Sequence, residues 1–124
     1  MIDIILYTSL LALVHIMLPN LVKSRFGEAT SERARKAAHN FAESLPVFFV
    51  LAILSIYPNV ESNVESNEIL ALVWLCLRLV FVSLYVSGIG TKPANEKGYE
   101  AQPLRSIVWI ISIGYLVKMA INLT

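Results

Sequence analysis

Four apolar segments occupy most of the chain, and their lengths constrain its fold more than any other feature. A helix needs roughly 20 apolar residues to cross about 30 Å of hydrocarbon. A soluble four-helix bundle would need a polar stripe along each helix, and stretches such as IILYTSLLALVHIML offer almost none. We therefore predict an all-α integral membrane four-helix bundle, with residues 1–124 forming a single domain. The expected helices are Ile4–Leu21, Ala37–Tyr57, Ile69–Ile89 and Leu104–Leu123.

The composition agrees with a membrane protein and argues against other classes. Of the 124 residues, 56% are hydrophobic and only 15% are charged, which is unusual for a soluble domain of this size. The net charge of +1 gives no electrostatic reason to expect a nucleic-acid partner. The single cysteine, Cys76, cannot form an internal disulfide, and His15 and His39 are too few to argue for a metal site.

The charges between the apolar segments predict the orientation of the chain. The first connection, Val22–Lys36, carries five basic residues against two glutamates, whereas the second, Pro58–Glu68, carries three glutamates and no base. The third, Gly90–Pro103, contributes Lys92 and Lys97. By the positive-inside rule, the first and third connections are cytoplasmic and both termini lie outside. The N-terminus lacks the basic region of a signal peptide, so we expect the first helix to be retained.

The second helix carries polar side chains toward the membrane interior. At about 100° per residue, His39 lies at the edge of this polar face and Arg35 points elsewhere. Glu43 lies roughly 10 Å deeper than Lys36 at 1.5 Å per residue. The residues that share the face are Arg33, Lys36, Asn40 and Glu43.

Arg78 is a second polar anomaly, because its position in the third helix is near the bilayer centre. An isolated charge there costs at least about 2.5–3.5 kcal/mol on insertion scales. We therefore expect Arg78 to pair with Glu43 on the neighbouring antiparallel helix. Such a pair can serve helix packing alone.

Further polar residues favour a ligand site over a purely structural pair. Tyr85 lies seven residues after Arg78 on the same face, and Arg105 and Ser106 open the fourth helix at about the same depth. Arginine binds carboxylates with two hydrogen bonds, a carboxylate accepts from an ammonium, and asparagine serves either group. A pocket of this kind suits glutathione, which carries two carboxylates, one ammonium and a thiol. A nearby cation such as Arg105 favours the nucleophilic thiolate.

These residues resemble a known family. The pattern Arg33-x-x-Lys36-x-x-His39-Asn40-x-x-Glu43-x-x-Pro46, followed by Arg78, Tyr85 and Pro103-Leu104-Arg105-Ser106-x-x-Trp109, is similar to that of the MAPEG family, the membrane-associated proteins in eicosanoid and glutathione metabolism. The resemblance covers nearly the whole chain. It implies a homotrimer of four-helix subunits, with glutathione bound between adjacent subunits near the cytoplasmic side.

The resemblance also implies roles for individual residues. Asn40 and Glu43 would hold the glutathione backbone, and Arg105 would stabilise its thiolate. Arg78 would support Glu43 and Ser106 would assist Arg105. The remaining residues expected along the ligand are Arg33, Lys36, His39 and Tyr85, with Lys23 or Arg25 reaching it from a neighbouring subunit.

Three positions depart from the eicosanoid-forming members. His39 stands where those synthases have an arginine, Phe81 where they have a polar or tyrosine side chain, and Trp109 where one has tyrosine. The Arg-Ser-x-x-Trp sequence and the compact length look more like the bacterial branch, which implies a bacterial inner membrane.

The leading hypothesis is a glutathione transferase or peroxidase that attacks a lipophilic electrophile or a lipid hydroperoxide arriving from membrane lipid. The alternative is a non-catalytic scaffold or a small four-helix transporter. Small multidrug exporters depend on a carboxylate within the first helix, where this chain has only Asp3 at the edge. A transport mechanism would therefore use Glu43.

Overall fold

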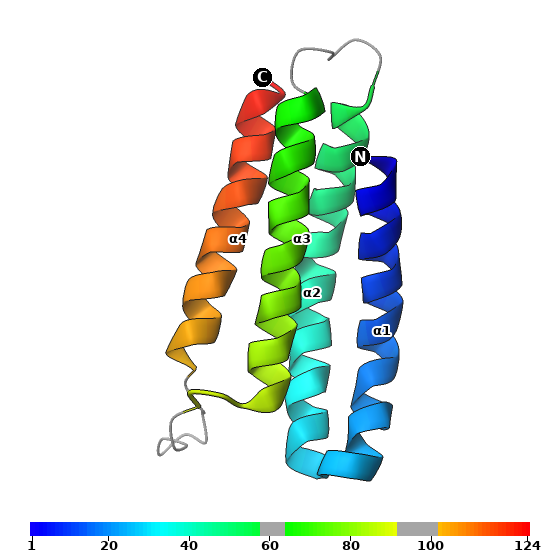
Figure 1. Cartoon of the computed structure of the whole chain (residues 1–124), viewed down its shortest axis with the longest axis vertical. Helices are drawn as coiled ribbons and strands as arrows, with labels where there is room; N and C mark the ends of the chain where they lie inside the picture. Colours follow the sequence, from blue (N-terminus) through cyan, green and yellow to red (C-terminus); the bar gives the residue numbers. More distant parts are fainter. Residues whose placement is uncertain (58–63, 92–101) are drawn as a thin grey trace.

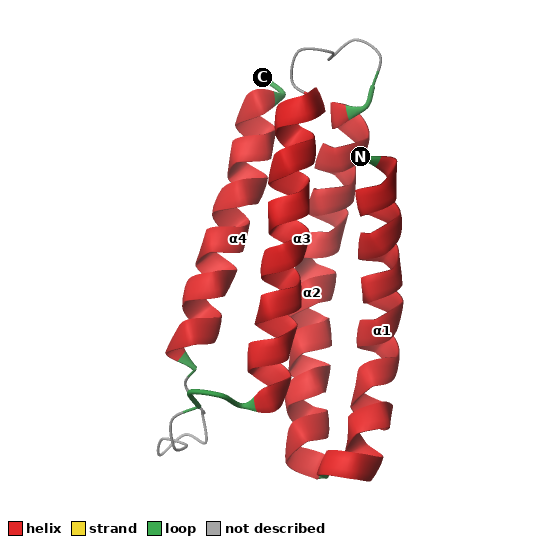
Figure 2. Ribbon diagram, in the orientation of Figure 1, coloured by secondary structure: helices red, strands yellow, loops and turns green. Residues whose placement is uncertain are grey.

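The fold is a bundle of four long helices. The computed structural model describes residues 1–57, 64–91 and 102–124. Figure 2 shows that helices make up nearly all of the described chain, which contains no strand. Each helix is long and apolar enough to cross a membrane, so the predicted all-α, four-span architecture is confirmed. The helices are α1 (Ile2–Phe26), α2 (Glu28–Ser55), α3 (Val64–Ser87) and α4 (Pro103–Asn122).

The helices run alternately up and down (Figure 1), with α2 and α3 central and α1 and α4 on opposite sides. Both chain termini lie at one end of the bundle, here called the terminal end, and the α1–α2 turn lies at the other, here called the Gly27 end. Many exposed side chains are large and apolar, Ile16 being 72% exposed. An apolar exterior of this kind suits contact with lipid.

The first connection differs from the prediction. We expected a connecting segment over Val22–Lys36, but α1 continues to Phe26 and α2 begins at Glu28, which leaves only Gly27 between them. Charge marks where the chain leaves hydrocarbon and does not mark where a helix ends, because Ala, Glu, Arg and Lys are strong helix formers in water. Gly27 makes the break with a φ of 90°, in the left-handed region that glycine adopts without strain.

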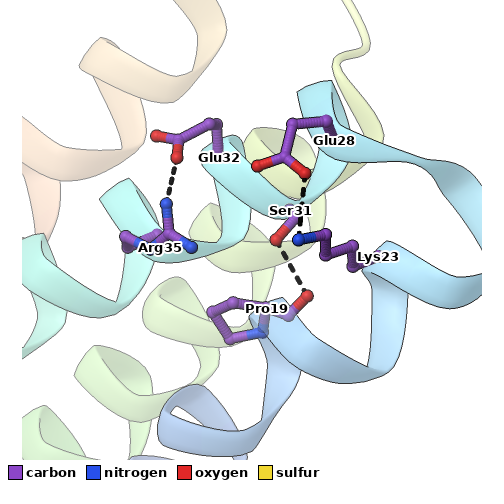
Figure 3. A network of polar contacts seen from close by, with 6 residues as sticks. All are labelled: Pro19, Lys23, Glu28, Ser31, Glu32 and Arg35. Atoms are coloured by element: carbon purple, nitrogen blue, oxygen red, sulfur yellow. Dashed lines mark hydrogen bonds and ion pairs between the residues drawn. The ribbon is translucent and has the colours of Figure 1, made fainter.

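Two side-chain contacts between α1 and α2 stabilise the turn that connects them (Figure 3). The Ser31 hydroxyl of α2 donates to the Pro19 carbonyl of α1 at 2.9 Å. Lys23 and Glu28 form an ion pair of 3.3 Å across the break. The turn is therefore a close, helical connection.

The other two expected connections fall largely outside the described residues. Lys92 and Lys97, which entered the orientation argument, lie there. Of the second expected connection, Pro58–Glu68, the part from Val64 onward is helical, because α3 begins at that residue.

Stacked aromatic rings fill the centre of the bundle. Trp74 of α3 is fully buried, with its ring centroid 4.2 Å from that of Phe48 and 6.0 Å from that of Phe41 on α2. His15 of α1 stacks on Phe41 at 4.3 Å, and its Nδ1 donates to the Leu11 carbonyl at 2.8 Å. These rings join α1, α2 and α3 through one apolar cluster.

A buried carboxamide joins α2, α3 and α4 at the terminal end. Asn67 Nδ2 donates to Ser55 Oγ at 2.8 Å and to the Met119 carbonyl at 3.2 Å. Its Oδ1 accepts from Asn122 Nδ2 at 2.9 Å. Asn67 and Ser55 are both fully buried, so these bonds replace contacts with water.

We predict that Asn67→Ala destabilises the bundle, because it leaves the Asn122 amide and the Ser55 hydroxyl without this partner. Loss of such buried bonds costs about 1–3 kcal/mol. Unfolding of the purified protein in detergent, followed by circular dichroism, measures the change. Asn20→Ala, which removes an exposed carboxamide on α1, is the matched control. Equal stability of the two variants would contradict the role of this cluster.

Candidate functional site

A cavity of about 650 Å³ opens near the Gly27 end between α2, α3 and α4. We call it the site cavity. It combines side chains from residues 35–43 of α2, the last two turns of α3 and the start of α4. Its lining residues are Arg35, Lys36, His39, Asn40, Glu43, Phe81, Tyr85, Arg105, Ser106 and Trp109.

Most of the polar residues singled out from the sequence lie in this cavity. The helical spacing of the α2 residues places them on one wall, and the antiparallel course of α3 and α4 brings their polar residues to the same depth. Two of the expected residues, Arg33 and Arg78, are not part of its lining. The expected residues that the cavity brings together are Lys36, His39, Asn40, Glu43, Tyr85, Arg105 and Ser106.

Arg33 turns away from the cavity and binds the end of α3. Its Nε donates to the Val86 carbonyl at 3.2 Å, and its Nη2 donates to Thr30 Oγ1 at 3.2 Å. A cation at a helix C-terminus is favoured by the helix dipole and by the unpaired carbonyls there. Gly88 permits this approach: with a φ of 72°, its absent Cβ would lie only 3.3 Å from the guanidinium.

Arg35, which we expected to point elsewhere, lines the site cavity instead. It also pairs with Glu32 one turn earlier on α2 (Figure 3). Helical spacing places Arg35 off the polar face, but its long side chain still reaches the cavity.

The partner of Arg78 differs from the prediction. Arg78 is fully buried, and its Nη2 donates to Asn40 Oδ1 at 2.8 Å. Its Cζ lies 4.4 Å from the Phe81 ring centroid. Glu43 pairs with His39 at 3.1 Å, and its side chain keeps 65% exposure. The expected Arg78–Glu43 ion pair is therefore absent from the described residues.

The physical reason lies in desolvation. Burying a carboxylate beside Arg78 would strip water from two charges, and their attraction often fails to offset that loss. The Asn40 oxygen and the Phe81 ring contact the guanidinium instead, so only one charge is buried. Glu43 thereby keeps an exposed side chain at the cavity. The Nε and Nη1 of Arg78 have no hydrogen-bond partner among the described residues.

The contact with Arg78 also fixes the orientation of the Asn40 amide. A guanidinium has only donors, so the atom facing Arg78 must be the amide oxygen. The Nδ2 group is then left as the donor that Asn40 can offer to the cavity it lines. Arg78 does not line the site cavity, but it sets which end of the Asn40 amide can face that cavity.

Arg105 is held over an aromatic ring at the cavity. Its Cζ lies 4.0 Å from the Tyr85 ring centroid, and its Nη1 donates to Gln102 Oε1 at 3.0 Å. The Tyr85 ring in turn meets Phe81 edge-on at 5.6 Å. Two cation–π contacts and one ring contact thus connect Arg78, Phe81, Tyr85 and Arg105 in one row.

Gln102, which accepts the hydrogen bond from Arg105, was not among the residues predicted from the sequence. The signal was available in its spacing, because a residue three positions before Arg105 at the start of a helix lies on the same side of that helix. Only the packing against α3 could show that its side chain would be 2% exposed.

An apolar groove of about 400 Å³ continues from the site cavity toward the terminal end, between α2 and α4. We call it the apolar groove. It shares Asn40, Glu43 and Trp109 with the site cavity, so the two are contiguous. Its other lining residues are Ser44, Val47, Leu51, Ile113, Leu116, Val117 and Ala120.

Comparison with known proteins bears on this arrangement. The sequence model of the family described as MAPEG matches residues 4–124, essentially the whole chain. The chain belongs to the MAPEG family. The resemblance seen in the sequence is therefore confirmed. No curated protein and no solved structure gives a match.

Membership of the MAPEG family, together with the four apolar helices, makes the protein an integral, multi-pass membrane protein. It also supports a role related to glutathione or eicosanoid metabolism in a membrane. The mixed polar and apolar character of the contiguous cavities is consistent with such a role.

Double-mutant cycles test the partner of Arg78. We predict a coupling energy of about 1.5–3 kcal/mol between Arg78→Met and Asn40→Ala, because their hydrogen bond involves a charged group. The cycle of Arg78→Met with Glu43→Gln serves as the control and should give less than about 0.5 kcal/mol, the range found for independent sites. Unfolding in detergent supplies the free energies. Stronger coupling to Glu43 than to Asn40 would refute the assignment.

Proposed function

We propose that this protein is a membrane-bound glutathione transferase or peroxidase, with the site cavity as its glutathione site. The observation that carries the proposal is the Arg105 guanidinium, held at 4.0 Å over Tyr85 in a cavity that also offers Lys36, Asn40 and Glu43. This set provides cations for carboxylates, an anion for an ammonium and an amide donor. The cavity volume of about 650 Å³ falls within the range of roughly 300–1,000 Å³ typical of small-molecule sites.

The residues suggest how glutathione would be arranged. Glu43 would accept from the ligand's ammonium group, and the oriented Nδ2 of Asn40 would donate to a carboxylate or peptide oxygen. Lys36 and His39 lie farther toward the Gly27 end and would face the second carboxylate. Arg105 would then meet the thiol, with Ser106 beside it and the Tyr85 ring beneath. Arg33 is left out of this arrangement because its guanidinium binds the α3 terminus.

Arg105 would act on the thiol electrostatically. A nearby cation lowers a thiol pKa and raises the fraction of thiolate, which is the nucleophile. In conjugation, the thiol proton passes to solvent, the thiolate forms a carbon–sulfur bond, and the leaving group departs with its electron pair. In peroxide reduction, the thiolate attacks the O–O bond and yields an alcohol and a sulfenic acid, which a second glutathione converts to disulfide and water.

The apolar groove would supply the second substrate. It joins the site cavity at Asn40, Glu43 and Trp109, so an apolar molecule lying along it places its near end beside the thiol site. Its walls are otherwise largely aliphatic. This favours a lipophilic electrophile or lipid hydroperoxide that enters from the bilayer.

Assembly and orientation complete the proposal. The working protein is a homotrimer with the Gly27 end cytoplasmic, in a bacterial inner membrane, so that cytosolic glutathione reaches the cavity directly. The basic residues of the α1–α2 turn support this orientation under the positive-inside rule. Lys23 or Arg25, both exposed at the end of α1, would reach the ligand of an adjacent subunit.

Glutathione binding to the detergent-purified protein tests the proposal by calorimetry and by the ultraviolet absorbance of the thiolate. We predict that Arg105→Ala abolishes the thiolate signal at neutral pH. Glu43→Gln weakens binding roughly ten- to hundredfold, because it removes a charge-assisted hydrogen bond worth about 1.5–3 kcal/mol. Lys118→Ala, at the far end of α4, removes an exposed charge as the control.

Unchanged turnover in both site variants would refute the catalytic mechanism. A wild-type protein that binds no glutathione at millimolar concentration would instead support a non-catalytic scaffold. Proton-coupled uptake abolished by Glu43→Gln would identify a transporter.

A further inference from the structure

Gln102 immediately precedes α4 and lies in the interior of the bundle. Its side chain is only 2% exposed. Its Oε1 accepts from Arg105 Nη1 at 3.0 Å, and its Nε2 donates to the Leu84 carbonyl of α3 at 3.3 Å. One carboxamide therefore connects the cationic group of the site cavity to the last turns of another helix.

The orientation of this amide is fixed by its two partners. A guanidinium only donates and a backbone carbonyl only accepts. Exchanging the amide oxygen and nitrogen would set donor against donor and acceptor against acceptor. Gln102 thus has a single orientation that satisfies both ends.

Two restraints on Arg105 come from adjacent residues of α3. Leu84 anchors the Gln102 amide, and Tyr85 places its ring 4.0 Å from the Arg105 Cζ. One restraint acts in the plane of the guanidinium and the other on its face. The long, flexible side chain of Arg105, at the start of α4, is thereby held in a fixed position relative to α3.

The chemical type of Gln102 suits this task. A carboxamide oxygen accepts the hydrogen bond without bringing a negative charge to Arg105. A carboxylate at the same place would accept the same bond, but would offset the cation that a thiolate needs nearby. The amide of Gln102 therefore holds Arg105 without adding an anion beside it.

We propose that Gln102 is a positioning residue, which holds the Arg105 guanidinium at the thiol end of the site cavity through an uncharged hydrogen-bond acceptor. This proposal rests on the proposed glutathione function of the same cavity. Gln102 itself acts through Arg105.

The test measures the pKa of the thiol of bound glutathione in the purified full-length protein, by titrating thiolate absorbance at saturating glutathione. Gln102→Glu is isosteric and adds a charge, whereas Gln102→Met keeps a similar volume and removes the hydrogen bonds. We expect Gln102→Glu to raise the thiol pKa by about 1 unit or more, as an added nearby anion does, and Gln102→Met to raise it by less. Glutathione affinity should change far less in both than in Glu43→Gln, because Gln102 does not line the site cavity.

Asn122→Ala is the matched control, because it removes a carboxamide that bonds across the same α3–α4 pair at the terminal end. It should leave the thiol pKa unchanged. A shift as large as that of Gln102→Met would show that general loosening of α4 is the cause, and would overturn the proposal.

The remaining outcomes separate this inference from the proposed function. If Arg105→Ala raises the thiol pKa while both Gln102 variants retain the wild-type value, the positioning role is wrong and the proposed function stands. If the wild-type protein binds glutathione without forming thiolate, or does not bind it, the proposed function fails and the role of Gln102 fails with it.

Discussion

The burial of one guanidinium organises the site end of this bundle. Arg78 lies fully inside an apolar assembly, where an isolated charge is strongly disfavoured. It is accommodated by the Asn40 oxygen and by the Phe81 ring. Asn40 is thereby turned toward the site cavity, and Phe81 supports Tyr85, on which Arg105 rests. Side chains that never touch Arg78 thus depend on how its charge is satisfied.

Helical periodicity and segment length accounted for much of this architecture. Residues spaced three and four apart from Lys36 to Glu43 share one cavity wall, and four apolar runs became four helices. Both inferences depend only on the spacing of residues along one helix, which can be counted in the sequence. They required no knowledge of how side chains meet between helices.

The predictions that failed were of two kinds. Some required a choice between possible side-chain partners, and one treated a charged segment as a loop. Arg78 had two polar candidates one turn apart on α2; it bonds Asn40, while Glu43 pairs with His39 and stays exposed. Arg33 shares the polar face by spacing, but the carbonyls ending α3 attract it away. The charged stretch between α1 and α2 is almost wholly helical. Spacing alone did not reveal the interhelical bridge of Gln102 either.

The single-residue break at Gly27 has a consequence for the environment of the cavity. Because α2 runs for 28 residues, it measures about 42 Å at 1.5 Å per residue, well beyond the roughly 30 Å thickness of hydrocarbon. Most charged residues of α2 lie in its first turns, so the excess length suits a placement of this end among the lipid headgroups. In that placement the charges at the cavity mouth would lie near a dielectric boundary, where Coulomb forces are stronger than in bulk water. A charged ligand can be recognised there without entering hydrocarbon.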